Sequence, residues 1–213
     1  MHRVLIVDDH PLVRQGLSDS LNRTEDLCVC GEAEGLMSAL TVVRETNPAL
    51  VTIDLGLTDG SGLELIKEIK AVHPEVRILV LSMQDESLYA ERCLRAGADG
   101  FIGKDEPPER ILAAIRTVLA GRVHVSPEQA SRMLNRAIRG RKESTSPLDL
   151  LTDRELEVFS LIGNGLTTRQ IAEKLDLSPK TIESYRENIK SKLDLENAIR
   201  LQQRAVQWVI EKA

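Results

Sequence analysis

Charged and hydroxyl side chains follow several apolar, strand-like runs at the point where each run ends. Asp8 and Asp9 follow residues 3–7, Asp54 follows residues 50–53, and two more runs end at Ser82 and Lys104. In an open parallel sheet the carboxyl ends of the strands lie along one edge, which is where ligands bind. We therefore expect these five side chains to meet. A lone aspartate after a strand is more often a turn residue or a helix cap, so the prediction depends on this convergence.

The residue types favour phosphoryl chemistry at that edge. Clustered carboxylates repel one another unless a cation joins them, and hard oxygen ligands suit Mg²⁺, which also pairs with phosphate oxygens. Asp54 can then act as a nucleophile toward a phosphoryl group whose oxygens are neutralised by the metal, Lys104 and the Ser82 hydroxyl. The predicted product is an aspartyl phosphate. His10 is interpreted as a loop residue, because no second histidine lies at ligand spacing.

Strand-like and helix-like segments alternate along the first part of the chain. The expected strands are residues 3–7, 28–34, 50–54, 77–82 and 100–103, and the expected helices are 11–22, 36–45, 62–73, 86–96 and 108–120. Pro11 and Pro108 stand where a first helical turn tolerates proline, and Gly97 ends a helix. Leu12 and Val72 are expected on the buried helix faces. This alternation predicts a doubly wound α/β fold, with a parallel sheet and helices on both faces.

Composition sets the broad class of the protein. A chain of 213 residues with 42% hydrophobic content can bury the cores of two domains, and an aromatic content of 2% means that these cores are aliphatic. No apolar run approaches the roughly 18 residues of a membrane span, so we expect a cytoplasmic protein without membrane contact. Cys28, Cys30 and Cys93 follow no metal-binding pattern and are interpreted as small buried apolar residues.

The chain changes character after residue 121. Residues 122–147 are predicted to form a linker with a helix from residue 128, and the linker ends in the charged, turn-rich run 139–147. Four helices are expected beyond it, at residues 153–163, 168–175, 179–193 and 197–211. Ser178 and Pro179 favour the start of the third of these, whose outer faces are polar. Two short helices joined by a tight turn, the second with an exposed polar face, predict a helix-turn-helix.

Charge alone does not show whether this helix binds DNA. The net charge of −5 and the pI near 5.5 argue against a generally basic surface, although they allow a local patch. Lys180, Arg186 and Lys190 lie on the helix, whereas Glu183 and Glu187 weaken a positive face. A glutamate can accept a hydrogen bond from cytosine N4 in the major groove, so it can specify sequence. A solvated helix without nucleic-acid contacts is the alternative.

The first part of the chain resembles the receiver domain of two-component response regulators. The resemblance rests on Asp8-Asp9, on Asp54 followed by Gly62, on Ser82, on Ala96-Gly97-Ala98-Asp99-Gly100 and on Lys104. It implies a five-stranded sheet of order 2-1-3-4-5 and phosphorylation of Asp54 by a sensor histidine kinase. It also implies Mg²⁺ held by Asp8, Asp9, Asp54 and the Gly56 carbonyl, with Ser82 and Phe101 reorienting toward the phosphate.

Two positions depart from the pattern of that family. The family commonly has Met-Pro where this chain has Leu57-Thr58, which we interpret as loop variation. It also commonly has proline after the lysine, where this chain has Asp105. This second departure leaves open whether the Lys104–Asp105 peptide is cis or trans.

The last segment resembles the LuxR-type DNA-binding domain in residues 151–158, 165–167, 170–172, 177–183 and 192–193, so the whole chain resembles a NarL/FixJ-type response regulator. By matching positions, the resemblance implies that bases are faced by Lys180, Glu183, Ser184 and Glu187. Phosphates would mainly be contacted by Thr181, Arg186 and Lys190. The resemblance also implies that part of the last helix pairs two DNA-binding domains, with Leu201, Ala205, Trp208 and Val209 as candidates. Core packing of these four residues is the alternative.

The sequence thus predicts a receiver domain at residues 1–121, a linker at 122–147 and a helix-turn-helix domain at 148–213. The predicted function is that of a transcriptional regulator, not an enzyme, which binds promoter DNA as a homodimer when Asp54 is phosphorylated. One alternative is a DNA-binding regulator that does not depend on phosphorylation. Another is a phosphatase of the haloacid dehalogenase type, but that enzyme needs a second acid two residues after the nucleophile, where this chain has Gly56.

Overall fold

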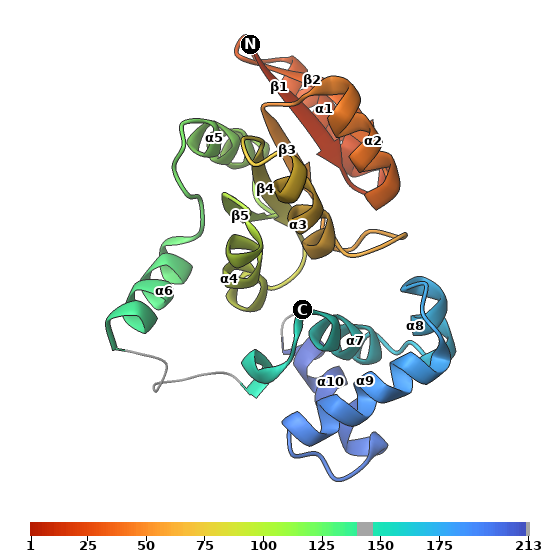
Figure 1. Ribbon diagram of the computed structural model, residues 1–213. Coiled ribbons are helices and arrows are strands. Elements are labelled where there is room, and N and C mark those ends of the chain that lie inside the picture. The colour runs from red at the N-terminus through yellow and green to blue at the C-terminus, as the bar shows by residue number, and fades with distance from the viewer. Residues whose placement is uncertain (140–146, 212–213) are drawn as a thin grey trace. The chain divides into compact units, whose positions relative to one another are not determined.

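The computed structural model describes residues 1–139 and 147–211 (Figure 1). The chain forms two compact units, Met1–Leu134 and Asn135–Ala213. Most of the charged run predicted as a tether, residues 140–146, lies outside the described residues. Within the described ranges, no helix combines the length and the apolar character that crossing a membrane requires.

The first unit is built on a five-stranded parallel sheet. Its strands are β1 (His2–Val7), β2 (Leu27–Ala33), β3 (Leu50–Ile53), β4 (Arg77–Ser82) and β5 (Gly100–Gly103), and they pair in the order β2-β1-β3-β4-β5. The short strands are rich in β-branched and aliphatic residues, which suit a sheet that is covered on both faces. Both the fold class and the strand order predicted from the sequence are confirmed.

Helices cover both faces of this sheet. On one face, α1 (Pro11–Asn22) and α5 (Pro108–Leu119) pack against strand residues such as Val4, Ile6 and Leu79, and Leu21 and Ile115 come from the two helices. Over the other face, α2 (Leu36–Thr46), α3 (Gly62–Val72) and α4 (Glu86–Ala96) lie beside one another in chain order (Figure 1). Successive strand residues point to opposite faces, so each apolar strand supplies both layers of the core.

The stretch between α4 and β5 is held by one aspartate. Gly97 ends α4 with a φ of +112°, a conformation that favours glycine. Asp99 then accepts hydrogen bonds from the Ile78 N–H at 2.9 Å, from Lys70 at 3.1 Å and from Arg77 at 2.6 Å. Burial by itself would raise the pKa of Asp99, but these three donors outweigh it and lower the pKa below its usual value. This contact fixes where β5 begins beside β4.

Two positions expected in the core are exposed. The Leu12 residue is 88% exposed, because the nine residues that separate it from buried Leu21 turn the helix by about 100° each and place it on the opposite side of α1. Val72 is the last residue of α3 and is also exposed. Of the cysteines, only Cys93 is buried, as predicted. Cys28 and Cys30 are half-exposed, since β2 is an edge strand.

The first unit continues beyond Gly121, where the sequence predicted the end of the domain. The Phe101 N–H donates to the His124 carbonyl at 2.8 Å, and the His124 N–H donates to the Asp99 carbonyl at 3.1 Å, so this segment lines the free edge of β5. The helix α6 (Pro127–Arg139) follows. The predicted linker helix exists, but His124 before it is bonded to the edge of the sheet, and the boundary between the units falls after Leu134.

The second unit is a bundle of helices with tight amino-terminal caps. A short 3₁₀ turn (η1, Pro147–Leu150) leads into α7 (Asp153–Gly163), α8 (Thr168–Lys174), α9 (Pro179–Lys192) and α10 (Ala198–Ile210). The side chains of Thr152, Thr167, Ser178 and Asn197 each accept a hydrogen bond from a backbone N–H in the first turn of the helix that follows. The four helices predicted from the sequence are confirmed.

The core of this unit lies where α7, α9 and α10 meet. Phe159 of α7 and Trp208 of α10 pack with their ring centroids 5.7 Å apart. Ile182 and Ile189 of α9 are fully buried, as is Leu201 of α10. The apolar face of α9 therefore points into the bundle, which leaves its polar residues on the outside.

Candidate functional site

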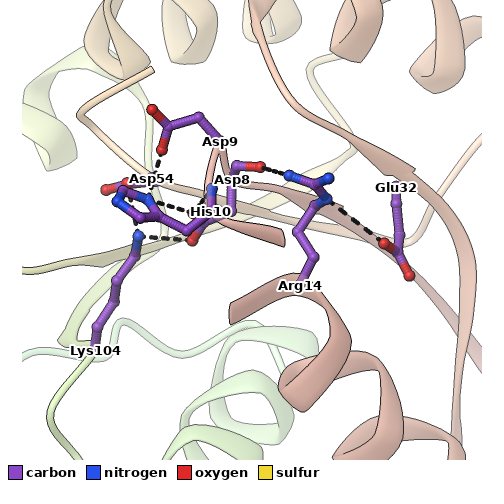
Figure 2. Close-up of polar contacts among 7 residues, drawn as sticks. All are labelled: Asp8, Asp9, His10, Arg14, Glu32, Asp54 and Lys104. Carbon is purple, nitrogen blue, oxygen red and sulfur yellow. Dashed lines mark hydrogen bonds and ion pairs between the residues drawn. The ribbon is translucent and has the colours of Figure 1, made fainter. Parts of the chain in front are cut away.

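The carboxyl ends of three strands bring the predicted acidic and basic side chains together. Val7 and Ile53 are paired across β1 and β3, and the Asp54 N–H donates to the Val7 carbonyl at 2.9 Å, so Asp8 and Asp54 emerge side by side. Lys104 reaches the same point from the end of β5 (Figure 2). Residues distant in the sequence meet because parallel strands present equivalent ends at one edge of the sheet.

Lys104 bridges two of the carboxylates. Its Nζ lies 2.7 Å from Asp54 Oδ2 and 2.7 Å from Asp8 Oδ2, and its side chain is 7% exposed. Burial by itself would lower the pKa of the Lys104 ammonium. The hydrogen bonds that Lys104 donates to Asp54 and Asp8, together with the negative charges of these carboxylates, outweigh burial and raise the pKa of Lys104 above its ordinary value. Lys104 therefore remains a cation next to Asp54 at neutral pH.

The pocket retains excess negative charge and fits a divalent cation. Ligand atoms of Asp8, Asp9, His10 and Asp54 all lie within 4.8 Å of one another. Three carboxylates face the single charge of Lys104, which leaves a formal charge of −2. The buried Asp9 Oδ1 accepts no hydrogen bond, although His10 Nδ1 lies 2.6 Å away. A buried carboxylate oxygen that accepts no hydrogen bond is a suitable ligand for a hard cation.

The loop after Asp54 approaches the same pocket. A Cβ atom built at Gly56 would lie 3.8 Å from Asp54 Oδ2, so the backbone at Gly56 runs beside this carboxylate. Further along the loop, the Asp59 carboxylate accepts hydrogen bonds from the Leu36 N–H at 2.6 Å and the Met37 N–H at 3.2 Å. Asp59 thus anchors the loop to the first turn of α2 and occupies backbone donors that a helix start leaves unpaired.

His10, which the sequence predicted as a loop residue, lies in the loop before α1 and borders this site. Arg14, which was not predicted, borders it as well. His10 precedes α1, and its N–H donates to Asp8 Oδ1 at 2.9 Å. Arg14 donates to the Asp8 carbonyl at 2.5 Å, and its Nε lies 3.6 Å from Glu32 Oε2, as Figure 2 shows. The position of His10 directly after two acids was a signal for the first. The contact of Arg14 with Glu32 depends on β1–β2 pairing and has no local signal.

The predicted switch residues lie in the same part of the sheet. The Ser82 carbonyl accepts a hydrogen bond from the Lys104 N–H at 3.1 Å, which places Ser82 beside Lys104, and the Ser82 hydroxyl accepts one from the Gln84 N–H. Phe101 is buried in β5 beside Val80. Among the described residues, neither Ser82 nor Phe101 forms a hydrogen bond with Asp54. No described peptide bond is cis, so the bond between Lys104 and Asp105 is trans.

A second group of candidate residues lies on α9. Lys180, Glu183, Ser184 and Glu187 are exposed, in agreement with a face directed outward. Arg186 and Lys190 are more covered, and each lies near an acid three residues earlier: Arg186 Nε is 3.7 Å from Glu183 Oε2, and Lys190 Nζ is 2.9 Å from Glu187 Oε1. The Thr181 hydroxyl bonds to Ser178 at the helix start. The positive charges of Arg186 and Lys190 are therefore balanced by acids of the same helix.

The predicted pairing residues of α10 need correction. Leu201, Ala205 and Trp208 are buried in the core of the second unit, so their side chains do not form an outer surface. Val209 is half-buried, and a Cβ atom at Gly163 would lie 2.6 Å from its Cγ2, so it packs on α7. The alternative of core packing describes these residues. The exposed apolar residues of the helix are Ile199 and Ile210, each 68% exposed.

Comparison with protein families covers both units. The model of the response regulator receiver domain matches residues 4–116, and the model of bacterial regulatory proteins of the luxR family matches residues 149–205. The chain belongs to the NarL/FixJ-type response regulators. This response regulator is a two-component transcriptional regulator with a LuxR-type DNA-binding domain.

Relatives of this response regulator match nearly its whole length. A putative transcriptional regulator of Pseudomonas aeruginosa is 38% identical over 194 residues, covering 91% of this chain and 92% of the relative. The oxygen regulatory protein NreC of Staphylococcus haemolyticus is 36% identical over 200 residues, with 92% of each chain covered. Because one unit matches the receiver family and the other the luxR regulatory family, the phosphatase alternative is set aside.

Solved structures agree with the fold. The RcsB response regulator of Salmonella typhimurium is 30% identical, covers 97% of each chain and superposes with a TM-score of 0.74. RcsB from Salmonella enterica serovar Typhimurium, bound to promoter rprA in the presence of the phosphomimetic BeF₃⁻, is 30% identical with a TM-score of 0.68, covering 95% of this chain and 96% of that chain.

Proposed function

We propose that Asp54 of this response regulator accepts a phosphoryl group and that this event controls DNA binding by α9. The observation that carries the proposal is the contact of Lys104 Nζ with both Asp54 and Asp8 at 2.7 Å. A buried cation at this distance from the acceptor carboxylate is placed to neutralise the oxygens of an incoming phosphoryl group. Asp54 is also at the carboxyl end of a central strand, where ligands of such sheets bind.

The reaction we propose is an in-line transfer from a phosphohistidine of a partner kinase. A carboxylate oxygen of Asp54 attacks phosphorus, and the P–O bond forms as the P–N bond of the donor breaks. The donor nitrogen keeps the electron pair and takes up a proton. Lys104 then exchanges its contact with the free carboxylate for one with a phosphoryl oxygen. The Ser82 hydroxyl is the second donor that we assign to the phosphoryl group.

Asp8, Asp9, Asp54 and the Gly56 carbonyl would hold Mg²⁺ in this pocket. When bound, the ion supplies neutralisation of the phosphoryl oxygens and of the clustered carboxylates. The buried Asp9 Oδ1 and the excess negative charge of the pocket support this assignment. Arg14 supports the ligands through the Asp8 carbonyl, which it holds at the turn between the two acids.

The output that we propose is binding of promoter DNA in the major groove by α9. Lys180, Glu183, Ser184 and Glu187 would face base edges, and Thr181, Arg186 and Lys190 would mainly contact phosphates. The exposure of the first four residues supports this arrangement. Reorientation of Ser82 and Phe101 is the step by which we propose that phosphorylation changes the receiver. RcsB, a relative of similar architecture, is described on promoter DNA with a phosphomimetic, which also supports it.

The pairing surface of two DNA-binding domains is proposed on the outer side of α10. Ile199, Gln203, Val206 and Ile210 follow one another at spacings of four, three and four residues, which places them along one stripe of the helix. Ile199 and Ile210 are exposed, Gln203 is exposed and Val206 is half-exposed. This stripe replaces the buried residues Leu201, Ala205 and Trp208 as the candidate for contact with a second copy.

To test this, the full chain is treated with acetyl phosphate and Mg²⁺. Intact mass measures phosphorylation, and selection from a randomised DNA duplex library measures DNA binding. We expect one acid-labile phosphoryl group in the wild type. The control variant Asp105→Asn, which removes the exposed carboxylate next to Lys104, should carry one as well. Asp54→Asn should carry none. Phosphorylation should strengthen enrichment of one sequence, and Val206→Glu should weaken enrichment of sites with two halves.

Labelling of Asp54→Asn at another residue would refute the assignment of the acceptor. Equal DNA enrichment with and without the phosphoryl group would instead favour the regulator that does not depend on phosphorylation. A Val206→Glu variant that still sediments as a dimer on a two-half site would show that the stripe on α10 is not the pairing surface. Each result addresses a separate part of the proposal.

A further inference from the structure

A hydrogen bond between the two helices of the helix-turn-helix holds one predicted base-facing side chain. The Thr168 hydroxyl, at the first residue of α8, donates to Glu183 Oε1 on α9 at 2.7 Å. On the other side, Arg186 Nε lies 3.7 Å from Glu183 Oε2. The Glu183 side chain is 55% exposed. An exposed carboxylate is thus hydrogen-bonded at one oxygen and lies near a cation at the other, within one unit of the chain.

The hydrogen bond from Thr168 restrains a glutamate side chain that lies on an exposed helix face. A free glutamate side chain samples many rotamers, and ordering it on binding costs conformational entropy. A side chain that is ordered before binding avoids much of this cost and presents its acceptor in one direction. Among the residues that the structure describes, the Thr168 hydroxyl makes no other hydrogen bond, because the residue that caps α8 is the preceding one, Thr167. The Thr168 hydroxyl is therefore available for the positioning of Glu183.

We propose that Thr168 is a positioning residue that aims the Glu183 carboxylate at the exocyclic amine of a cytosine in the major groove. This inference rests on the proposed DNA binding by α9 and names the base that one of its residues reads. With Oε1 bound to Thr168, Oε2 is the oxygen that faces a base. Arg186, near Oε2, offsets the repulsion between this carboxylate and the phosphates of the backbone.

The choice of cytosine follows from the groups that each base presents in the major groove. Guanine presents only acceptors and thymine presents an acceptor and a methyl group, so a carboxylate is repelled or unpaired at both. Adenine presents its N6 donor next to the N7 acceptor, which repels a carboxylate that approaches the amine. Cytosine presents its N4 donor next to an apolar C–H. A carboxylate with one available oxygen is therefore best satisfied by cytosine.

The test uses the full chain and selection from a randomised DNA duplex library, followed by sequencing. In the wild type we expect enrichment of cytosine at one position of each half-site by about tenfold over other bases, the discrimination expected of one good contact. Glu183→Gln and Thr168→Val should both reduce this preference to within about threefold at that same position. Thr168→Ser, which keeps the hydroxyl, should retain it.

Two further measurements show whether Thr168 affects DNA binding only by stabilising the fold. They are the base preferences at the other positions of the DNA site and the melting temperature of the variant. We expect both to be unchanged in Thr168→Val. If the added methyl group lowers its melting temperature, Thr168→Ala removes the hydroxyl without adding volume and decides the question. A cytosine preference that survives removal of the Thr168 hydroxyl overturns the positioning role, and one that survives Glu183→Gln overturns the base contact. A wild type that enriches no sequence overturns this inference together with the proposed DNA binding.

Discussion

The receiver pocket and the helix α9 both carry pairs of opposite charge, but the pairs lie in different environments. Lys104 and its partners Asp8 and Asp54 are nearly excluded from water. On α9, the acids of the pairs Arg186–Glu183 and Lys190–Glu187 are more than half exposed. Buried charges that lose a partner are costly, whereas exposed pairs contribute little to stability. A change of charge in the pocket should therefore change the stability of the receiver strongly. The ion pairs on α9 can be broken at little cost in stability when other charges compete for them.

The largest effect on stability is expected from Lys104→Met. This change leaves the Asp8 and Asp54 carboxylates buried without their cation, which should lower the free energy of unfolding of the receiver by about 3 kcal/mol. Added Mg²⁺ should restore more stability to the variant than to the wild type, because it replaces the missing positive charge. Urea unfolding followed by far-UV circular dichroism, with and without Mg²⁺, measures both quantities.

The matched control is Lys190→Met, which removes a lysine whose partner, Glu187, is exposed; it should change stability by less than about 0.5 kcal/mol without a response to Mg²⁺. Equal losses in the two variants would contradict the distinction between the two regions. A Lys104→Met variant as stable as the wild type without Mg²⁺ would show that the clustered carboxylates do not depend on this cation.

An intermediate effect on stability is expected at the Glu155–Lys192 pair, in which Glu155 is buried and Lys192 is about a third exposed. Lys192 Nζ donates to Glu155 Oε2 at 2.6 Å, and the Thr152 N–H donates to the same oxygen at 2.7 Å. Burial alone would raise the pKa of Glu155, but Lys192 and Thr152 outweigh it and lower the pKa. A lowered pKa in the folded state adds stability above the ordinary value of 4.5, and this stability is lost as the pH falls through the folded pKa.

The fluorescence of Trp208, the single tryptophan, reports unfolding of this unit. Lys192→Met should lower its stability by roughly 1–2 kcal/mol at neutral pH, less than for a fully buried pair because Lys192 is a third exposed. The loss of stability below about pH 4.5 should be smaller in the variant. A wild type whose urea midpoint does not fall in this acidic range would contradict the assignment.

The smallest effect on stability is expected from Glu187→Gln. Glu187 is exposed and paired with Lys190, so its neutralisation should change the free energy of unfolding by less than about 0.5 kcal/mol. Binding to DNA of arbitrary sequence should become tighter and more dependent on salt, because Lys190 is freed to pair with a phosphate. Fluorescence anisotropy over a salt series measures this. An unchanged salt slope would show that Lys190 does not exchange partners.

Much of the fold was predictable because its signals are local. The strands and helices of the first unit begin and end within one or two residues of the predicted bounds, since short β-branched runs, Pro11, Pro108 and Gly97 act where they stand. The exposure of Leu12 and Val72 was not predicted. An apolar residue at helical spacing indicates a face, but the position of the neighbouring elements decides whether that face is covered.

The candidate site also has features that were predictable from the sequence and features that were not. The convergence of Asp8, Asp54 and Lys104 was predicted from the chain order, because parallel strands place equivalent ends at one edge. The roles of Arg14 and Thr168 were not, since each contacts a residue on another element. The residues first assigned to pairing on α10 also depended on tertiary contacts.

By itself, the sequence determined the order of the elements, the side chains at the strand ends and the caps of the helices, since each depends on neighbours along the chain. Only the tertiary structure decided that Lys104 bridges two carboxylates, that Glu183 is held by Thr168 and that Trp208 faces inward. These contacts join segments far apart in the chain. Their geometry is set by how helices and strands pack, and no local pattern of residues carries that information.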